Sequence, residues 1–242
     1  MRNIKIIIEY DGTKFHGWQF QKEQRSVQGE LQKAVQHITG EDVVVEGAGR
    51  TDTGVHARGQ VGNFKIEKAI EPDALQKGLN AVLPNDVRIK AIEEVDLNFH
   101  ARFSAKSRRY KYRIVQQPIA IGRQYHWFYP HLLNFEIMQQ SVAHLLGEKS
   151  FKAFCLSEAE VNHYRCHVLH ARWYEENGLK IFEIHANRFL HNMVRCLVGT
   201  FINLGKGKIS ANDLPMIIAK EDRKLAGFTA PAVGLCLEEV IY

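Results

Sequence analysis

The chain has 242 residues, of which 45% are hydrophobic and 24% are charged, and its formal net charge is +5. This composition excludes a disordered protein, and the length is enough for one large domain or two small domains with a real core. No stretch approaches the roughly 18 apolar residues of a membrane span, and the N-terminal run is too short for a signal peptide. We therefore expect a cytoplasmic protein.

Hydrophobic periodicity predicts the element order βαββαβ in the first hundred residues. The predicted strands cover residues 3–9, 43–47, 60–66 and 87–94, and the predicted helices cover 27–38 and 72–81. Ser26 is placed to cap the first helix, and Pro72 suits the first turn of the second.

The rest of the chain repeats this order of elements without a visible sequence repeat. Strands are predicted at 108–115, 168–174, 179–185 and 235–241, and helices at 135–146, 189–203 and 213–219. Asn177-Gly178 is a strong hairpin signal between two of the strands. We predict an α+β fold of two ferredoxin-like (RNP-like) domains, residues 1–103 and 104–242, with mostly antiparallel sheets and a cleft at their junction.

The four cysteines are scattered and form no C-x-x-C pair, which is typical of reduced thiols in a reducing compartment. Cysteines and histidines gather between Cys155 and His170, but their spacing fits no standard zinc finger. No metal site is expected.

The least ordinary stretch is Gly47-Ala48-Gly49-Arg50-Thr51-Asp52-Thr53-Gly54, which fits neither a Walker loop nor a Rossmann fingerprint. In an extended chain Arg50 and Asp52 point to the same side, where the arginine favours the ionised carboxylate. An ionised carboxylate suits a nucleophile, and the motif lacks the second carboxylate that glycoside hydrolysis normally requires. A simple turn in which the aspartate caps the backbone is the structural alternative.

Six Lys or Arg residues and no acid lie between Arg102 and Arg113, interleaved with Tyr110 and Tyr112. A basic strand with aromatics is expected where a phosphate backbone and stackable bases bind. By alternation Tyr110 faces away from Lys111 and could look into a pocket. A solvated strand face and a core tyrosine are the alternatives.

The helix predicted at 189–203 carries Arg195 at the border of a wide apolar stripe. Arg195 should therefore be partly covered and should need an anionic partner. A structural carboxylate, Asp52 and an RNA phosphate are the three candidates.

Taken together, these stretches resemble the tRNA pseudouridine synthase A family over nearly the whole chain. The shared motifs, in the expected order, are Glu9-Tyr10-Asp11-Gly12-Thr13, Gly17-Trp18-Gln19, Gly47 through Ala57, His100-Ala101-Arg102-Phe103-Ser104-Ala105, Arg109-Tyr110-Lys111-Tyr112, Asn187 through Arg195, and Gly234-Leu235. The Gly-Arg-Thr-Asp-x-Gly-Val-His motif is highly specific, and it outweighs the structural alternatives given above.

The resemblance implies a homodimeric isomerase that converts uridine to pseudouridine at tRNA positions 38, 39 and 40 of the anticodon stem-loop, without cofactor or metal. By the same resemblance, Asp52 is the nucleophile, and Tyr110 either only stacks on the target uracil or stacks on it and also serves as a base. Arg50 and Arg195 pair with the aspartate and help to hold the flipped nucleotide. Whether Asp52 attacks the uracil ring or the ribose anomeric carbon stays open.

Two positions depart from the family pattern: Phe20 stands where many members carry Arg, and Thr53 replaces the commoner Ala beside the aspartate. Two other classes of function are also considered. A non-catalytic RNA-binding module would not need Arg50 and Asp52 in a glycine-rich loop. A carboxylate-based glycosidase acting on nucleosides would release free uracil.

Overall fold

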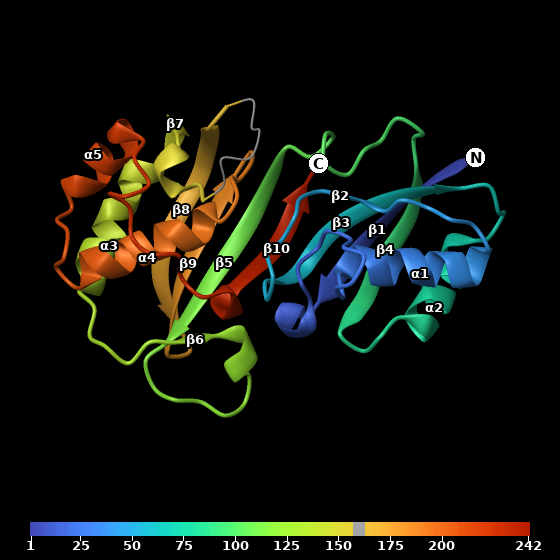
Figure 1. Cartoon of the computed structure of the whole chain (residues 1–242), viewed down its shortest axis with the longest axis horizontal. Coiled ribbons are helices and arrows are strands. Elements are labelled where there is room, and N and C mark those ends of the chain that lie inside the picture. Colours follow the sequence, from blue (N-terminus) through green and yellow to red (C-terminus); the bar gives the residue numbers. More distant parts are fainter. Residues whose placement is uncertain (157–162) are drawn as a thin grey trace. The chain divides into compact units, whose positions relative to one another are not determined.

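The structure, a computed structural model, describes residues 1–156 and 163–242. These residues form two compact units, Met1–Lys106 together with Cys236–Tyr242, and Ser107–Leu235. In each unit helices pack on strands that are mostly antiparallel (Figure 1). The predicted α+β class is confirmed.

The first unit is built around β1 (Arg2–Tyr10), which lies between β4 (Val87–Val95) and β3 (His56–Ile66) and is antiparallel to both. The other edge of β3 carries two short pairings, an antiparallel one with β2 (Glu46–Gly47) and a parallel one with β10 (Leu235–Ile241). All the predicted strands of this half are present.

The core of the first unit lies between this sheet and two helices. The buried hydrophobic residues of β1 alternate along the strand, as expected of a half-buried strand, and include Ile4, Ile6 and Ile8. Helix α1 (Val27–Thr39) and helix α2 (Pro72–Val82) contact each other, and α2 packs against β4 (Figure 1). The predicted cap is confirmed, because the Ser26 side chain accepts a hydrogen bond from the Gly29 N–H at 3.3 Å.

Strand β2 is shorter than the strand predicted at 43–47. The Val45 N–H donates to the Gln32 side chain at 3.3 Å, and the Val45 carbonyl accepts from the Gln28 side chain at 2.9 Å. Both glutamines belong to α1. Side chains of the helix therefore satisfy the backbone that the alternation assigned to a strand.

The second unit is an antiparallel sheet in the order β5 (Ser107–Val115), β9 (Leu179–Ala186), β8 (Arg165–Glu176) and β7 (Gly147–Ser150). The short strand β6 (Trp127–Phe128) pairs in parallel with β5. Its helices are α3 (Phe135–Ser141), α4 (Met193–Gly205) and α5 (Asp213–Lys220). In its core the rings of Trp173 and Phe182 stack, and the Phe201 ring meets Trp173 edge to face.

Two helices of the second unit differ from their predicted bounds. The helix predicted at 189–203 begins only at Met193, because Asn192 adopts a left-handed backbone with φ 62. The helix predicted to reach residue 146 ends at Ser141 and tightens into a 3-10 turn, Val142–Leu145. The hairpin between β8 and β9 is confirmed, with Asn177 at φ 52.

The predicted domain division placed residues 104–242 together, and the structure differs from it chiefly at the last strand. From Cys236 onward β10 belongs to the first unit, and it pairs with β3 at His56 and Ala57. Two further hydrogen bonds hold this segment there, Lys106 N–H to the Ile241 carbonyl at 2.8 Å and the Tyr242 hydroxyl to the Ala101 carbonyl at 2.7 Å. The first unit therefore contains both ends of the chain.

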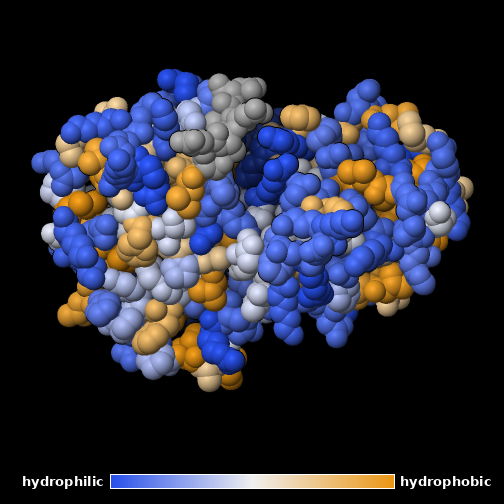
Figure 2. All heavy atoms as spheres, in the orientation of Figure 1, coloured by the Kyte–Doolittle hydropathy of each residue, from blue (hydrophilic) through white to orange (hydrophobic). Residues whose placement is uncertain are grey.

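No helix among residues 1–156 and 163–242 is long and apolar enough to cross a membrane. Figure 2 shows that the face in view is mostly hydrophilic, with hydrophobic residues in small scattered groups.

Candidate active site

The glycine-rich stretch forms the connection between β2 and β3 in the first unit. Thr51 is buried, whereas Arg50 is exposed and Asp52 is half-buried. This is the alternation expected of an extended chain, in which Arg50 and Asp52 point away from the interior while Thr51 points into it. The loop thus presents a basic and an acidic side chain from the same short segment.

Buried side chains hold the inward-facing positions of this loop. The Tyr10 hydroxyl lies 2.7 Å from the Thr51 hydroxyl, and the Gln60 side-chain amide donates to the Gly49 carbonyl at 2.9 Å. Tyr10 is 3% exposed and Gln60 is fully buried. Because buried polar groups are costly without partners, these hydrogen bonds fix the loop against the sheet.

Backbone contacts from residues 12–18 clamp the same loop. The Trp18 N–H donates to the Thr51 carbonyl at 3.0 Å, and the Gly54 N–H donates to the Phe15 carbonyl at 3.2 Å. Gly17, at φ +84, lies so close that a Cβ there would be 2.5 Å from the Thr51 carbonyl oxygen. The Gly17-Trp18 motif is therefore a support for the Asp52 loop, although more than thirty residues separate them.

The turn at Gly12 supports the far end of the loop in the same way. A Cβ at Gly12 would lie 2.0 Å from the Val55 carbonyl oxygen. The Gly12 N–H donates to Nδ1 of His56 at 3.0 Å. This His56 nitrogen also lies 3.2 Å from an Asp11 carboxylate oxygen. This oxygen also accepts hydrogen bonds from the backbone N–H and the hydroxyl of Thr13. His56, the last residue of the loop motif named above, thus fixes this turn.

Tyr110 lies in β5 of the second unit and is 8% exposed. Its ring meets the Phe189 ring edge to face, with centroids 5.0 Å apart. Tyr112 and Ile114 are buried on the same face of the strand, while Lys111 is half-buried on the other. The predicted alternation is therefore present, and Phe189 orients the Tyr110 ring.

The charge of the basic strand is partly balanced by an acid on the neighbouring strand. Glu183 of β9 is 4% exposed, 3.3 Å from the Lys111 ammonium and 3.4 Å from the Arg172 guanidinium. Burial alone would raise the pKa of Glu183, but Arg172 and Lys111 together hold this pKa below its ordinary value. Strand β5 therefore offers less positive charge to phosphates than the number of its Lys and Arg residues indicates.

Arg195 lies in the first turn of α4 and is half-buried, as predicted. Its Nε donates to the Ala230 carbonyl at 2.8 Å, and its Nη1 donates to the Asn192 side-chain oxygen at 2.6 Å. The Ala230 N–H in turn donates to the Arg195 carbonyl at 3.1 Å. These contacts fix the direction of the guanidinium.

Comparison with known proteins identifies the family. A family model described as tRNA pseudouridine synthase matches residues 6–104 and 142–242. The chain is 46% identical over 244 residues to tRNA pseudouridine synthase A of Acetivibrio thermocellus, 44% to that of Caldicellulosiruptor saccharolyticus and 40% to that of Clostridium acetobutylicum. Each alignment covers 100% of both chains. The chain belongs to the tRNA pseudouridine synthase family.

The two segments matched to the tRNA pseudouridine synthase family include Arg50, Asp52 and Arg195, and Tyr110 lies between them. A solved structure described as "Crystal Structure of a Cbf5-Nop10-Gar1 Complex" is similar at a TM-score of 0.35 and 11% identity. The likeness covers 96% of this chain and 57% of that chain. It is too slight to support an argument.

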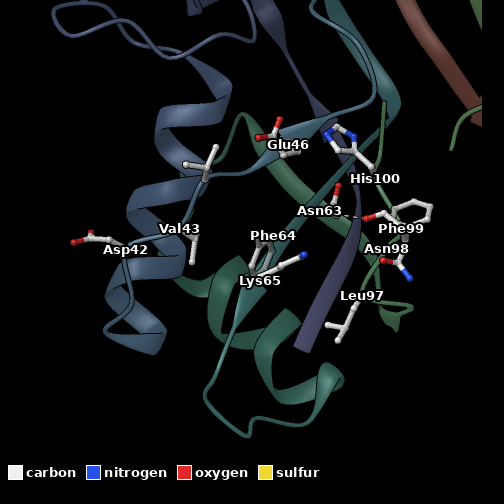
Figure 3. Close-up of a pocket in the computed structure, with 11 residues that line it drawn as sticks. Asp42, Val43, Glu46, Asn63, Phe64, Lys65, Leu97, Asn98, Phe99 and His100 are labelled. Carbon is white, nitrogen blue, oxygen red and sulfur yellow. Dashed lines mark hydrogen bonds between the residues drawn. The ribbon is translucent and has the colours of Figure 1, made fainter. Parts of the chain in front are cut away.

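The first unit also contains a cavity of about 550 Å³ (Figure 3). None of the four residues predicted for the active site lines this cavity. Its lining includes Glu46, Asn63, Lys65 and His100. The Asn63 side chain already donates to Asn3 at 3.0 Å and accepts from the Ala101 N–H at 2.8 Å. The side-chain amide of Asn63 is therefore satisfied within the protein itself.

The structure places the four predicted residues in two pairs. Arg50 and Asp52 share the loop of the first unit, whereas Tyr110 and Arg195 belong to the second unit. Sequence reasoning missed the support of the loop by Tyr10, His56 and Gln60. One signal was available for Tyr10, because a hydroxyl ends the apolar row of β1 and so requires a partner inside the core.

Proposed function

We propose that this chain converts uridine to pseudouridine at positions 38, 39 and 40 of the tRNA anticodon stem-loop, with Asp52 as the nucleophile. Membership of the tRNA pseudouridine synthase family supports an isomerase that acts on tRNA. The observation that carries the role of Asp52 is the way its loop is held. Buried side chains bind the loop at Gly49 and Thr51, while Arg50 and Asp52 face outward.

The proposed reaction consumes no co-substrate, because the product contains the same atoms as the substrate. The Asp52 carboxylate attacks either the uracil ring or the ribose anomeric carbon, and the bond from the anomeric carbon to N1 breaks. The uracil then rotates, the anomeric carbon bonds to C5, and the bond to Asp52 breaks so that its carboxylate is free again. The C5 proton leaves while N1 takes up a proton. A covalent adduct divides one difficult displacement into two easier steps.

Tyr110 is proposed to stack on the target uracil after the base leaves its own stack, which costs a few kcal/mol. Phe189 holds the Tyr110 ring edge to face, so the ring needs little reordering when a base arrives. Arg50 and Arg195 are proposed to pair with Asp52 and to hold the flipped nucleotide, and Ala230 and Asn192 already orient the Arg195 guanidinium.

We further propose that the two units are ferredoxin-like domains that together form the site. In the first unit the element order and the pairing order β4-β1-β3-β2 support this topology. A homodimer and a cytoplasmic location follow from the resemblance to the family and stay predictions. Light scattering of the purified protein, alone and with tRNA, tests the homodimer.

The direct test is incubation of the purified protein with an unmodified tRNA transcript, followed by carbodiimide mapping of pseudouridine. We expect modification at positions 38, 39 and 40. Free uracil as the final product would instead identify a glycosidase, and a tRNA that binds but stays unmodified would identify a binding module.

Asp52→Asn tests the nucleophile, because it keeps the size of the side chain and removes its charge. We expect turnover to fall by at least about a thousandfold while the Kd for tRNA changes by no more than a few-fold. The matched control is Asp73→Asn, the same change at an exposed carboxylate on α2, which should leave turnover unchanged. Pseudouridine formation by pure Asp52→Asn protein would overturn the assignment.

A further inference from the structure

A chain of buried polar side chains lies beneath the Asp52 loop, and the reaction scheme above does not use it. Tyr10 ends the core-facing row of β1, where Ile4, Ile6 and Ile8 precede it. A hydroxyl at this position adds nothing to the packing of the core. Because a buried hydroxyl is costly unless it is bonded, its presence points to a specific partner.

That partner is the loop itself. The Tyr10 hydroxyl bonds to the Thr51 hydroxyl at 2.7 Å, and the buried Gln60 side chain lies close to the same phenol. Gln60 in turn donates to the Gly49 carbonyl at 2.9 Å and accepts from the Val61 N–H at 3.1 Å. This buried network therefore holds Gly49 by its carbonyl and Thr51 by its hydroxyl.

These two positions determine where the outward-facing side chains point. Gly49 and Thr51 flank Arg50, and Thr51 directly precedes Asp52. In extended backbone neighbouring side chains point to opposite sides, so a Thr51 side chain held in the interior directs Arg50 and Asp52 away from it. Reacting groups have to be held within about 0.5 Å of the productive geometry, and a misplacement of about 1 Å can cost about a hundredfold in rate.

We propose that Tyr10, acting with Gln60 through Thr51, is a positioning residue that aims Asp52 and Arg50 for the reaction. This inference rests on the proposed function. Tyr10 does not touch the substrate in this scheme; its hydroxyl sets the place of the loop that does. Burial raises the pKa of Tyr10 above its ordinary value, so the phenol keeps its proton and the network keeps its bonds throughout the working pH range.

The test compares three variants that remove or restore single hydroxyls in the network. Tyr10→Phe and Thr51→Val each remove one hydroxyl and keep nearly the same shape, whereas Thr51→Ser keeps the hydroxyl and removes only a methyl group. The measurement is the single-turnover rate of tritium release from 5-tritiated uridine in a tRNA transcript, with enzyme in excess. The Kd for tRNA and the melting temperature are measured on the same preparations.

We expect Tyr10→Phe and Thr51→Val each to lower the single-turnover rate about 10-fold, with the Kd for tRNA within about two-fold of wild type. Thr51→Ser should restore most of the rate. The double variant Tyr10→Phe/Thr51→Val should be no slower than the slower single variant, because both changes break the same hydrogen bond.

The matched control is Tyr242→Phe, which also removes a phenol hydroxyl from a 2.7 Å bond in the first unit but outside the loop. Its rate should equal that of wild type, even if its melting temperature falls as far as that of Tyr10→Phe. This control separates a positioning role from general stability.

Two results would overturn the inference. One is a wild-type rate in Tyr10→Phe, and the other is a multiplicative loss in the double variant with no recovery in Thr51→Ser. Both can occur while wild-type protein still forms pseudouridine, so they refute the network without refuting the proposed function. An absence of pseudouridine with wild-type protein would refute the function itself.

Discussion

The Asp52 loop and the Arg195 turn are held in different ways. The loop is fixed by backbone hydrogen bonds from residues 12–18 and by two glycines on which no Cβ fits. The Arg195 guanidinium is oriented by hydrogen bonds of its own, among them those to Ala230 and Asn192. The main-chain part of the loop's support tolerates no added bulk, whereas the direction of the guanidinium depends on the polar atoms that it contacts.

The largest expected effect comes from adding a Cβ at Gly12, where it would lie 2.0 Å from the Val55 carbonyl oxygen. Both groups belong to main chain, so the turn or the loop has to move. We expect Gly12→Ala to lower the free energy of unfolding by about 2–4 kcal/mol, in the range of overpacking and strain.

Gly49→Ala is the matched control within the same loop, because a Cβ there meets nothing within 4 Å. Its free energy of unfolding, measured by denaturant titration, should stay within about 0.5 kcal/mol of wild type. Equal losses of unfolding free energy in the two variants would show that the close approach of Gly12 to Val55 does not determine the stability of the loop.

Arg195→Ala should act on catalysis more than on folding. We expect turnover to fall about a hundredfold, the size typical of a removed charge-stabilising donor, with only a small change in melting temperature. Asn192→Ala keeps the guanidinium and removes one of its acceptors, so its loss of turnover should be smaller. Normal turnover of Arg195→Ala with a large fall in melting temperature would assign the residue a structural role.

The smallest expected effect concerns Glu183 in the second unit, and it depends on pH. Because Lys111 and Arg172 hold the pKa of Glu183 below its ordinary value of 4.5, the ionised form stabilises the folded state. This contribution is present above the ordinary pKa and is lost as the pH falls through the lowered pKa of the folded state.

Glu183→Gln should therefore be less stable than wild type by about 1 kcal/mol at pH 7, since Arg172 is largely exposed and screened by solvent. The difference should shrink as the pH falls below about 4.5. Denaturant titrations of both proteins at several pH values measure it. A difference that is constant with pH would show that the charge of Glu183 contributes nothing.

Local patterns in the sequence predicted most of the elements. The apolar alternation of β1 and the Ser26 cap of α1 are short-range signals, and both are present. The loop with Asp52 was also marked by local residues, because its glycines and charges stand out in the sequence.

These local patterns could not predict contacts between residues that are far apart in the sequence. Periodicity continued α4 back to residue 189 because it carries no information on the left-handed backbone of Asn192. Charge counting along β5 missed Glu183, which reaches Lys111 from the next strand but lies more than seventy residues away. The support of the loop by Tyr10 and Gln60 also depends on strand pairing that only the fold reveals.

The return of β10 to the first unit also has a consequence for biosynthesis. The edge of β3 at His56 and Ala57, where the Asp52 loop ends, is completed by Cys236 and Leu237. A ribosome makes Cys236 and Leu237 long after β3, so this end of the strand that follows the loop lacks its parallel partner until β10 is made. A chain cut before Leu235 would carry every predicted catalytic side chain and still lack the strand that completes their scaffold.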